Sequence, residues 1–165
     1  VMSQGVSSIT NSKNKITASF LAQEGIEFIR NVRDTYYLSE EEKNIAWQNF
    51  RNVINNLCNS GGCYVLVDER SFFIGDGTIK DGFSTKYLVA PCSDNYCNIV
   101  YKKDVGLYSS PVSGSSGDPT PFSRKIYFEA LDADNTLKIT SEVSYVQGGK
   151  TNKVSFTDYL TNWAE

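Results

Sequence analysis

The chain has 165 residues, a formal net charge of −3 and no histidine. A chain near this length fits one domain with its own core, because it buries roughly 70% of its unfolded surface. The acidic balance argues against broad nucleic-acid binding, which usually needs a clustered basic face. The absence of histidine removes the commonest general base and metal ligand, so most hydrolase sites lose their central member.

The N-terminal part of the chain, residues 1–36, predicts one long amphipathic helix. Small and apolar residues recur at every third or fourth position, which places them along one side of a helix. These residues are Ala18, Leu21, Ala22, Gly25, Ile29, Val32 and Tyr36. The opposite side carries Gln23, Glu24, Glu27, Arg30, Asn31 and Arg33. The same spacing continues toward the N-terminus through Phe20, Ile16, Ile9, Val6 and Met2. Lys13 occupies the one position in this series that should be apolar.

A second, shorter helix is predicted after the first. Ser39 followed three positions later by Glu42 is a capping-box signature, so this helix should begin at Ser39. Gly61-Gly62 should end it. We interpret Trp47 as a core residue rather than a ligand-stacking platform, because aromatic burial dominates small cores. The apolar side of this helix would consist of Ala46, Phe50, Val53 and Leu57, with Trp47 and Ile54 beside it.

Beyond the second helix the pattern changes from helical spacing to alternation, which is typical of strands. Tyr64–Val67 and Phe72–Ile74 are β-rich runs that predict a hairpin. Tyr87–Val89 and Ile99–Tyr101 are weaker strand candidates. We expect an irregular surface connection over Ser109–Pro121, because this segment is rich in Ser, Gly and Pro.

The last third of the chain predicts the clearest sheet. Apolar and polar residues alternate through Ile126–Ala130, Leu137–Tyr145 and Val154–Phe156. Turn residues at Asp132–Asn135 and Gln147–Lys150 separate these runs, which predicts an antiparallel meander with one buried face. The apolar side of the long helix is the expected cover for that face. The sequence therefore predicts a single α+β domain, with a helical spine at 1–36, a second helix and connection at 37–63, and a strand-rich head at 64–165.

The four cysteines form two equally spaced pairs, Cys58 with Cys63 and Cys92 with Cys97. This even count predicts two local disulfides made in an oxidising compartment outside the cytoplasm. Four cysteines allow three connectivities, so pairing between the two loops stays open. Free thiols and a four-thiolate zinc site are less favoured, because zinc sites prefer tighter spacing and histidine is absent.

The acidic residues do not predict a catalytic or metal site. Asp132, Asp134 and Thr136 match the first ligand positions of a calcium-binding loop. Leu137, however, occupies the position that needs glycine, and Val143 occupies that of the bidentate glutamate. We therefore favour a plain turn, in which Asp and Asn are common. The charged helix residues lack a companion nucleophile and base, which favours a solvated face or a contact with another chain over catalysis. We expect no enzyme activity, no metal and no cofactor. The charged residues are Glu24, Glu27, Arg30, Arg33 and Asp34.

One run suggests a family. The string L-A-Q-E-G-I-E-F-I-R-N-V-R-D, from Leu21 to Asp34, closely resembles the helix of bacterial pilin-like proteins of the type IV pilus and type II secretion group. Thr120–Ile126 is similar to the family's threonine-proline-phenylalanine-x-arginine entry into its sheet, and Leu160–Trp163 to its closing segment. The resemblance implies a pilin-like α+β fold, in which a long N-terminal helix packs on an antiparallel sheet beside a second, shorter helix.

The resemblance also implies a function. Members of this family are structural subunits of filaments, as major pilins, minor pilins or pseudopilins, and act by assembly and surface contact. They begin with a leader and an apolar membrane anchor. Val1 corresponds to a point beyond that anchor, so we expect a membrane-anchored precursor, processed by a prepilin peptidase, and a mature protein at the cell surface. The expected partners are other pilin subunits, with the membrane contacted only through the anchor and no specific nucleic acid.

Packing of N-terminal helices in such a filament implies roles for particular residues. A mid-helix glycine costs about 1 kcal/mol relative to alanine, so Gly25 predicts close packing against another backbone. The expected subunit-packing residues are Ala18, Leu21, Ala22, Glu24, Gly25, Glu27, Ile29, Arg30, Arg33 and Asp34.

Two rival functions remain open from the residues alone. A secreted enzyme predicts a pocket with paired acidic residues. An extracellular carbohydrate- or surface-binding module predicts tyrosines that are exposed together, with Tyr36, Tyr37, Tyr96 and Tyr108 as the candidates.

Overall fold

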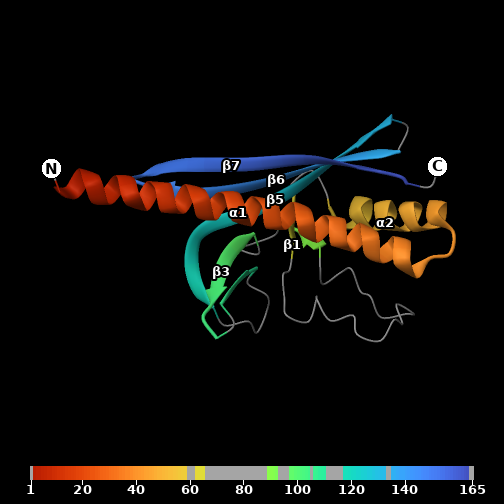
Figure 1. Cartoon of the computed structure of the whole chain (residues 1–165), viewed down its shortest axis with the longest axis horizontal. Coiled ribbons are helices and arrows are strands. Elements are labelled where there is room, and N and C mark those ends of the chain that lie inside the picture. The colour runs from red at the N-terminus through yellow and green to blue at the C-terminus, as the bar shows by residue number, and fades with distance from the viewer. Residues whose placement is uncertain are drawn as a thin grey trace.

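The computed structural model describes residues 2–58, 62–65, 89–92, 97–104, 106–110, 117–132 and 135–163, and these form an α+β structure (Figure 1). Its helices are α1 (Met2–Ser39) and α2 (Lys43–Leu57). Its strands are β1 (Cys63–Val65), β2 (Val89–Pro91), β3 (Asn98–Lys102), β4 (Leu107–Ser109), β5 (Asp118–Leu131), β6 (Thr136–Gln147) and β7 (Lys150–Thr161).

All of these strands join one antiparallel sheet. The long strands β5, β6 and β7 form the predicted meander, with Ile126 opposite Ser141 and Val143 opposite Val154. The other edge of β5 pairs with β1 and β3, which carry β2 and β4 respectively. The β6–β7 turn is tight because Gly148 and Gly149 take positive φ angles of 58° and 75°, which glycine adopts without strain.

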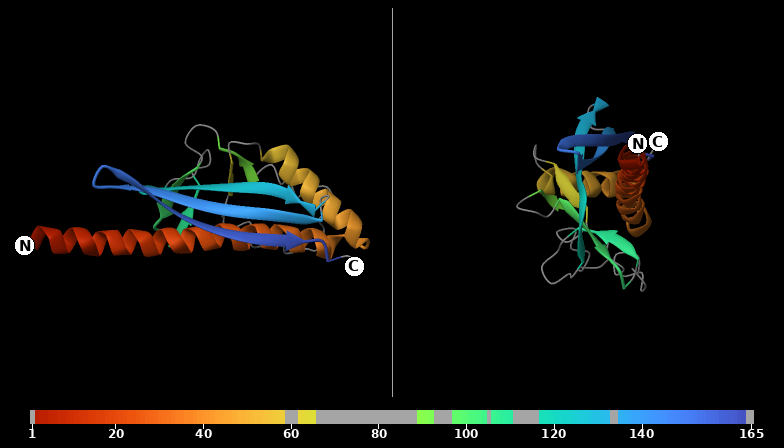
Figure 2. Two further views of the ribbon diagram at one scale, coloured as in Figure 1. Left: turned by 90° about the horizontal axis from the view of Figure 1, so that it is seen from above. Right: turned by 90° about the vertical axis from the view of Figure 1, so that its left-hand side faces the viewer.

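Helix α1 lies lengthwise along one face of the sheet, against β5, β6 and β7 (Figure 2). This arrangement confirms that the helix covers the buried face of the meander. Alternate residues of the strands point to this face, because successive side chains of a strand face opposite ways. The buried residues at this contact include Ala18, Leu21, Ala22, Ile29 and Val32 from α1, and Phe122, Ile126, Ile139 and Val143 from the strands.

The helix lies very close to the sheet at Gly25. A Cβ atom at this position would lie 2.6 Å from Ser141 Oγ and 3.2 Å from both Arg124 Cδ and Ile126 Cδ1. Only a residue without a side chain fits such an approach. The sequence correctly indicated close packing at Gly25, but the neighbours are side chains of the chain's own sheet.

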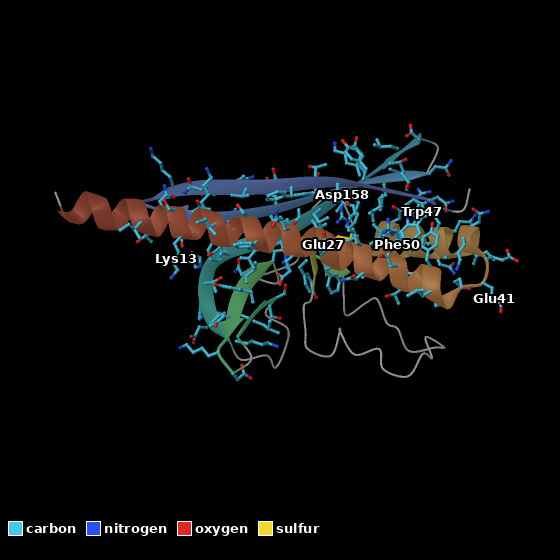
Figure 3. The ribbon with its side chains drawn as sticks, in the orientation of Figure 1. Lys13, Glu27, Glu41, Trp47, Phe50 and Asp158 are labelled. Carbon is cyan, nitrogen blue, oxygen red and sulfur yellow. A yellow bond between two sulfur atoms is a disulfide. The ribbon has the colours of Figure 1, made fainter. Side chains whose placement is uncertain are left out.

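Helix α2 folds back on the end of α1. Trp47 and Phe50 are buried, and their rings lie 5.7 Å apart, so Trp47 is a core residue as predicted (Figure 3). The predicted start of α2 is wrong. Ser39 is the last residue of α1, where its hydroxyl donates to the Tyr36 carbonyl, and Glu42 is the N-cap of α2 without a side-chain capping bond.

Two of the predicted segments need comment. β1 pairs with β2, whereas its predicted partner Phe72–Ile74 lies outside the described residues together with most of the predicted hairpin. Part of Ser109–Pro121 is regular, because β5 already begins at Asp118 and pairs Pro119 with Val100 of β3. Pro119 and Pro121 favoured a loop, but proline is tolerated near the start of a strand and at irregular pairings.

A further correction concerns the N-terminal half of α1. Ile9, Ile16 and Phe20 were expected to continue the apolar side that packs on the sheet, yet they are 71%, 58% and 66% exposed. Phe20 and the buried Ala22 are two residues apart, which is about 200° around a helix. The apolar residues of α1 therefore form two stripes on opposite sides, and the sheet covers one of them.

Replacing Gly25 with alanine should destabilise the protein by roughly 1–3 kcal/mol, because overpacking outweighs the gain in helix propensity. Ser141 Oγ is buried and finds no hydrogen-bond partner among the described residues, so Ser141→Ala alone should be nearly neutral. Combined with Gly25→Ala, it should recover part of the lost unfolding free energy in urea titrations. Equal stabilities of the Gly25→Ala variant and the parent would contradict this packing.

Candidate functional site

The charged residues of α1 between Glu24 and Asp34 fall into three groups, and each group joins the helix to another part of the chain. The first group involves Arg124 of β5, which is only 2% exposed because it lies on the same buried face of the strand as the apolar Phe122 and Ile126. Its Nη1 donates to the Leu21 carbonyl at 2.9 Å and to Glu24 Oε2 at 2.7 Å. A buried guanidinium needs such partners, since an unpaired charge in a protein interior is very unfavourable. Arg124 and Glu24 therefore hold α1 to the sheet beside Gly25.

The second group lies one helical turn further along α1. Arg30 donates through Nε to Asp158 Oδ2 of β7 at 2.9 Å, and through Nη1 to Glu27 Oε1 at 2.6 Å. The hydrogen bond to Asp158 raises the pKa of Arg30 above its already high value. Half-exposed pairs of this kind contribute little stability, typically about 0.2–1 kcal/mol. Their main consequence is that Arg30 is held toward β7, while the Glu27 carboxylate stays 60% exposed.

The third group fastens the C-terminal end of the described chain to α1. Trp163 stacks on Tyr37 with ring centroids 5.1 Å apart, and the Arg33 guanidinium carbon lies 4.3 Å from the Trp163 ring centroid. The Tyr37 hydroxyl donates to Asn162 Oδ1 at 2.7 Å, and Arg33 pairs with Asp34 at 2.7 Å. Burial raises the pKa of Tyr37. Stacking and cation–π contacts thus fix residues beyond the last strand.

Most of the predicted subunit-packing residues contact other parts of the same chain. Ala18, Leu21, Ala22, Gly25 and Ile29 are buried against the chain's own sheet. Glu24, Glu27, Arg30, Arg33 and Asp34 make the intrachain pairs described above. Contacts of these residues with another subunit stay a prediction. The opposite side of α1 carries a further set of apolar residues.

We define this side as the outer stripe, made of Ile9, Lys13, Ile16, Phe20 and Glu27. These residues follow one another at intervals of three, four or seven positions, so they share one side of the helix. All five are exposed. Three large apolar side chains in such a short stretch form the kind of exposed patch that marks an interaction surface. Neither α1 nor α2, over the described residues, contains a stretch apolar enough to cross a membrane.

The structure forms disulfides between Cys58 and Cys63 and between Cys92 and Cys97, the local pairing that the equal spacing favoured. The first joins the end of α2 to the start of β1, and the second precedes β3. Short loops of this kind gain modest stability from cross-linking, so their main role is to hold the connections in shape.

A cleft of about 430 Å³ lies where β3 and β5 meet the ends of β6 and β7. Its lining includes the side chains of Asn98, Thr120, Ser123 and Ser144 and carries no charged residue in the described part of the chain. The paired acidic residues that a secreted enzyme would need are therefore not found in this cleft.

The tyrosines do not form a common platform among the described residues. Tyr37 is buried beneath Trp163, and Tyr108 packs edge-on against Phe122. Tyr36 packs on the core near Phe50, and Tyr96 lies outside the described residues. The described part of the chain therefore lacks the group of exposed tyrosines that the binding-module interpretation predicts.

Sequence reasoning missed Arg124, Asp158 and Trp163 as partners of the helix. Arg124 carried a signal, because a charged residue in the apolar phase of a strand must be buried and paired. Asp158 and Trp163 carried no comparable signal, since their partners are more than 100 residues away.

Removing the carboxylate of Glu24 should harm stability more than removing the charge of Arg124. Glu24→Ala leaves a buried guanidinium without its carboxylate and should reduce the unfolding free energy by about 2–3 kcal/mol, whereas Arg124→Met should lose about 1 kcal/mol or less. Urea unfolding of both variants tests this order. The reverse order would show that the guanidinium is not desolvated.

Tyr37 should make the protein sensitive to alkali. Because the pKa of Tyr37 is raised in the folded state, its stabilising contribution is complete below the ordinary tyrosine pKa of 10.0 and is lost as the pH rises through the folded pKa. At pH 8, Tyr37→Phe should have an unfolding free energy about 1 kcal/mol lower than the parent, because it lacks the hydrogen bond of Tyr37. Above pH 10, its unfolding free energy should fall less steeply with pH than that of the parent. Identical slopes for Tyr37→Phe and the parent would show that Tyr37 does not cause the sensitivity to alkali.

The chain was compared with family models, curated proteins and solved structures. No family model, no curated protein and no solved structure matches it. The contacts of α1 are thus the basis on which a function can be assigned.

Proposed function

We propose that this chain is a pilin-like subunit, either a pilin or a pseudopilin, of a type IV pilus or type II secretion-like filament. It is made as a membrane-anchored precursor and works at the cell surface by assembly and contact rather than by catalysis. Other subunits of the filament are its partners. The fold class alone does not carry this assignment, since many α+β proteins have other functions.

The observation that carries the proposal is the second apolar side of α1. A helix that covers a sheet needs one apolar side. On α1 this side includes Ala18, Leu21, Ala22, Ile29 and Val32. The outer stripe adds Ile9, Ile16 and Phe20 on the other side, where they remain mostly exposed. A filament whose subunits bundle their N-terminal helices would bury these side chains and so account for both sides of the helix.

The rest of the structure suits a subunit whose head must stay attached to its helix. The Arg124–Glu24 pair, the Arg30–Asp158 pair and the Trp163 stack fasten α1 to β5, to β7 and to the segment after β7. These contacts occupy the sheet side of α1 between Leu21 and Tyr37. The outer stripe is left free to meet neighbouring helices without disturbing them.

Filament assembly should depend on Phe20. We would express the full-length gene in its native host, including the sequence encoded upstream of Val1, and look for the chain in filaments sheared from the cells. Phe20→Asp should reduce the sheared protein by roughly tenfold or more, because an unpaired carboxylate would be buried between helices.

The matched control is Tyr159→Asp. Tyr159 is 56% exposed, compared with 66% for Phe20, and points away from α1, since its neighbour Asp158 bonds to the helix. This variant should assemble like the parent. Normal filaments from Phe20→Asp, or absence of the parent chain from the sheared fraction, would count against the proposed function.

A further inference from the structure

The outer stripe carries opposite charges at equal distances from its centre. Lys13 and Glu27 lie on either side of Phe20, each about two helical turns away, so they are about 21 Å apart along the helix axis. Both side chains are exposed, and Figure 3 shows them on the same helix. The stripe therefore carries a basic residue on one side of Phe20 and an acidic residue on the other, with the apolar Ile16 and the exposed Gln23 between them.

Both charges are available to a partner. Lys13 makes no ion pair within the described part of the chain. Glu27 pairs with Arg30, but Arg30 also donates to Asp158 at 2.9 Å. If Glu27 paired with another chain, Arg30 would still be paired with Asp158. Releasing Glu27 therefore leaves no charge without a partner.

This pattern is complementary to itself when reversed. A second helix lying antiparallel, with the two-fold axis at Phe20, places Lys13 of each chain against Glu27 of the other and brings the two Phe20 rings together. Ile16 of each chain lies next to this aromatic centre. A parallel copy in register would instead place Lys13 against Lys13 and Glu27 against Glu27, which is unfavourable.

We propose that the unassembled chain pairs with a second copy of itself through the outer stripe, as an antiparallel two-fold dimer centred on Phe20. The long strands that α1 covers lie on the other side of the helix from the stripe (Figure 2). The dimer covers Ile16 and Phe20, two of the apolar side chains that a filament would use. Self-pairing therefore competes with assembly and keeps the apolar stripe from unspecific association. The dimer itself requires only the purified chain, so it is independent of the proposed filament.

Cysteine cross-linking tests the geometry. The four native cysteines are in disulfides, so one introduced cysteine provides a single reactive thiol. Under mild oxidation of the concentrated protein, Phe20→Cys should form disulfide-linked dimers. Lys13→Cys alone should stay monomeric, but should cross-link when mixed with Glu27→Cys. Dimers of Lys13→Cys with itself would indicate parallel pairing and overturn the proposal, as would a failure of Phe20→Cys to cross-link.

Charge reversal tests the ion pairs, with sedimentation equilibrium up to millimolar concentration as the measurement. Each pair occurs twice in a two-fold dimer, so Lys13→Glu alone and Glu27→Lys alone should each weaken dimerisation by about tenfold or more. The double variant should return to within about threefold of the parent, because the same pairs form with exchanged signs. A parent that remains monomeric, or a double variant no stronger than the single ones, would overturn the dimer. Loss of filaments in cells with an intact dimer would count only against the proposed filament function.

Discussion

The close approach of α1 to the sheet at Gly25 is the contact on which the rest of the structure depends. Gly25 lets the helix sit near Ser141 and Ile126, and only at this distance does the buried Arg124 reach both the Leu21 carbonyl and Glu24. A larger residue would lift the helix and separate the buried charge from its partners. Packing and charge pairing at this point reinforce each other, because each requires the same spacing between helix and strands.

That contact also decides which side of α1 faces away from the sheet. With Gly25 and Arg124 holding one side down, Ile9, Ile16 and Phe20 must point outward. An apolar patch without a partner favours association, and the proposed role in assembly depends on this orientation of the helix. The same patch serves two proposed contacts, between neighbouring subunits in a filament and between two unassembled chains. The opposite charges of Lys13 and Glu27 restrict the direction in which a partner helix can lie along this patch.

The remaining contacts of α1 keep the helix and the head as one unit. Arg30 reaches Asp158 on β7, and the stack of Trp163 on Tyr37 secures the segment that follows β7. These contacts extend over the C-terminal half of α1, whereas its N-terminal end projects past the β6–β7 turn, near which Asn14 bonds to Gln147 (Figure 2). Several contacts of this kind are needed to hold the helix to the head, since each half-exposed pair is weak by itself.

Much of this architecture could be predicted from the sequence, because it follows from local periodicity. The long helix, the β5–β6–β7 meander, its two turns, the burial of Trp47 and the tight packing at Gly25 are all encoded in the spacing of neighbouring residues. Errors arose where local signals competed. The capping-box pattern at Ser39 predicted a helix start, but α1 continues to this residue. The prolines after Asp118 predicted a loop, but β5 begins there.

The sequence by itself determined that α1 has apolar residues at helical spacing, but the sheet decided which of them are covered. Phe20 and Ala22 both fit a helical repeat, and only the position of β5 and β6 makes one exposed and the other buried. The partners of Arg124, Arg30 and Arg33 were likewise set by tertiary structure. These pairs join residues far apart in the chain, and their geometry depends on strand register and helix placement, which local preferences do not specify.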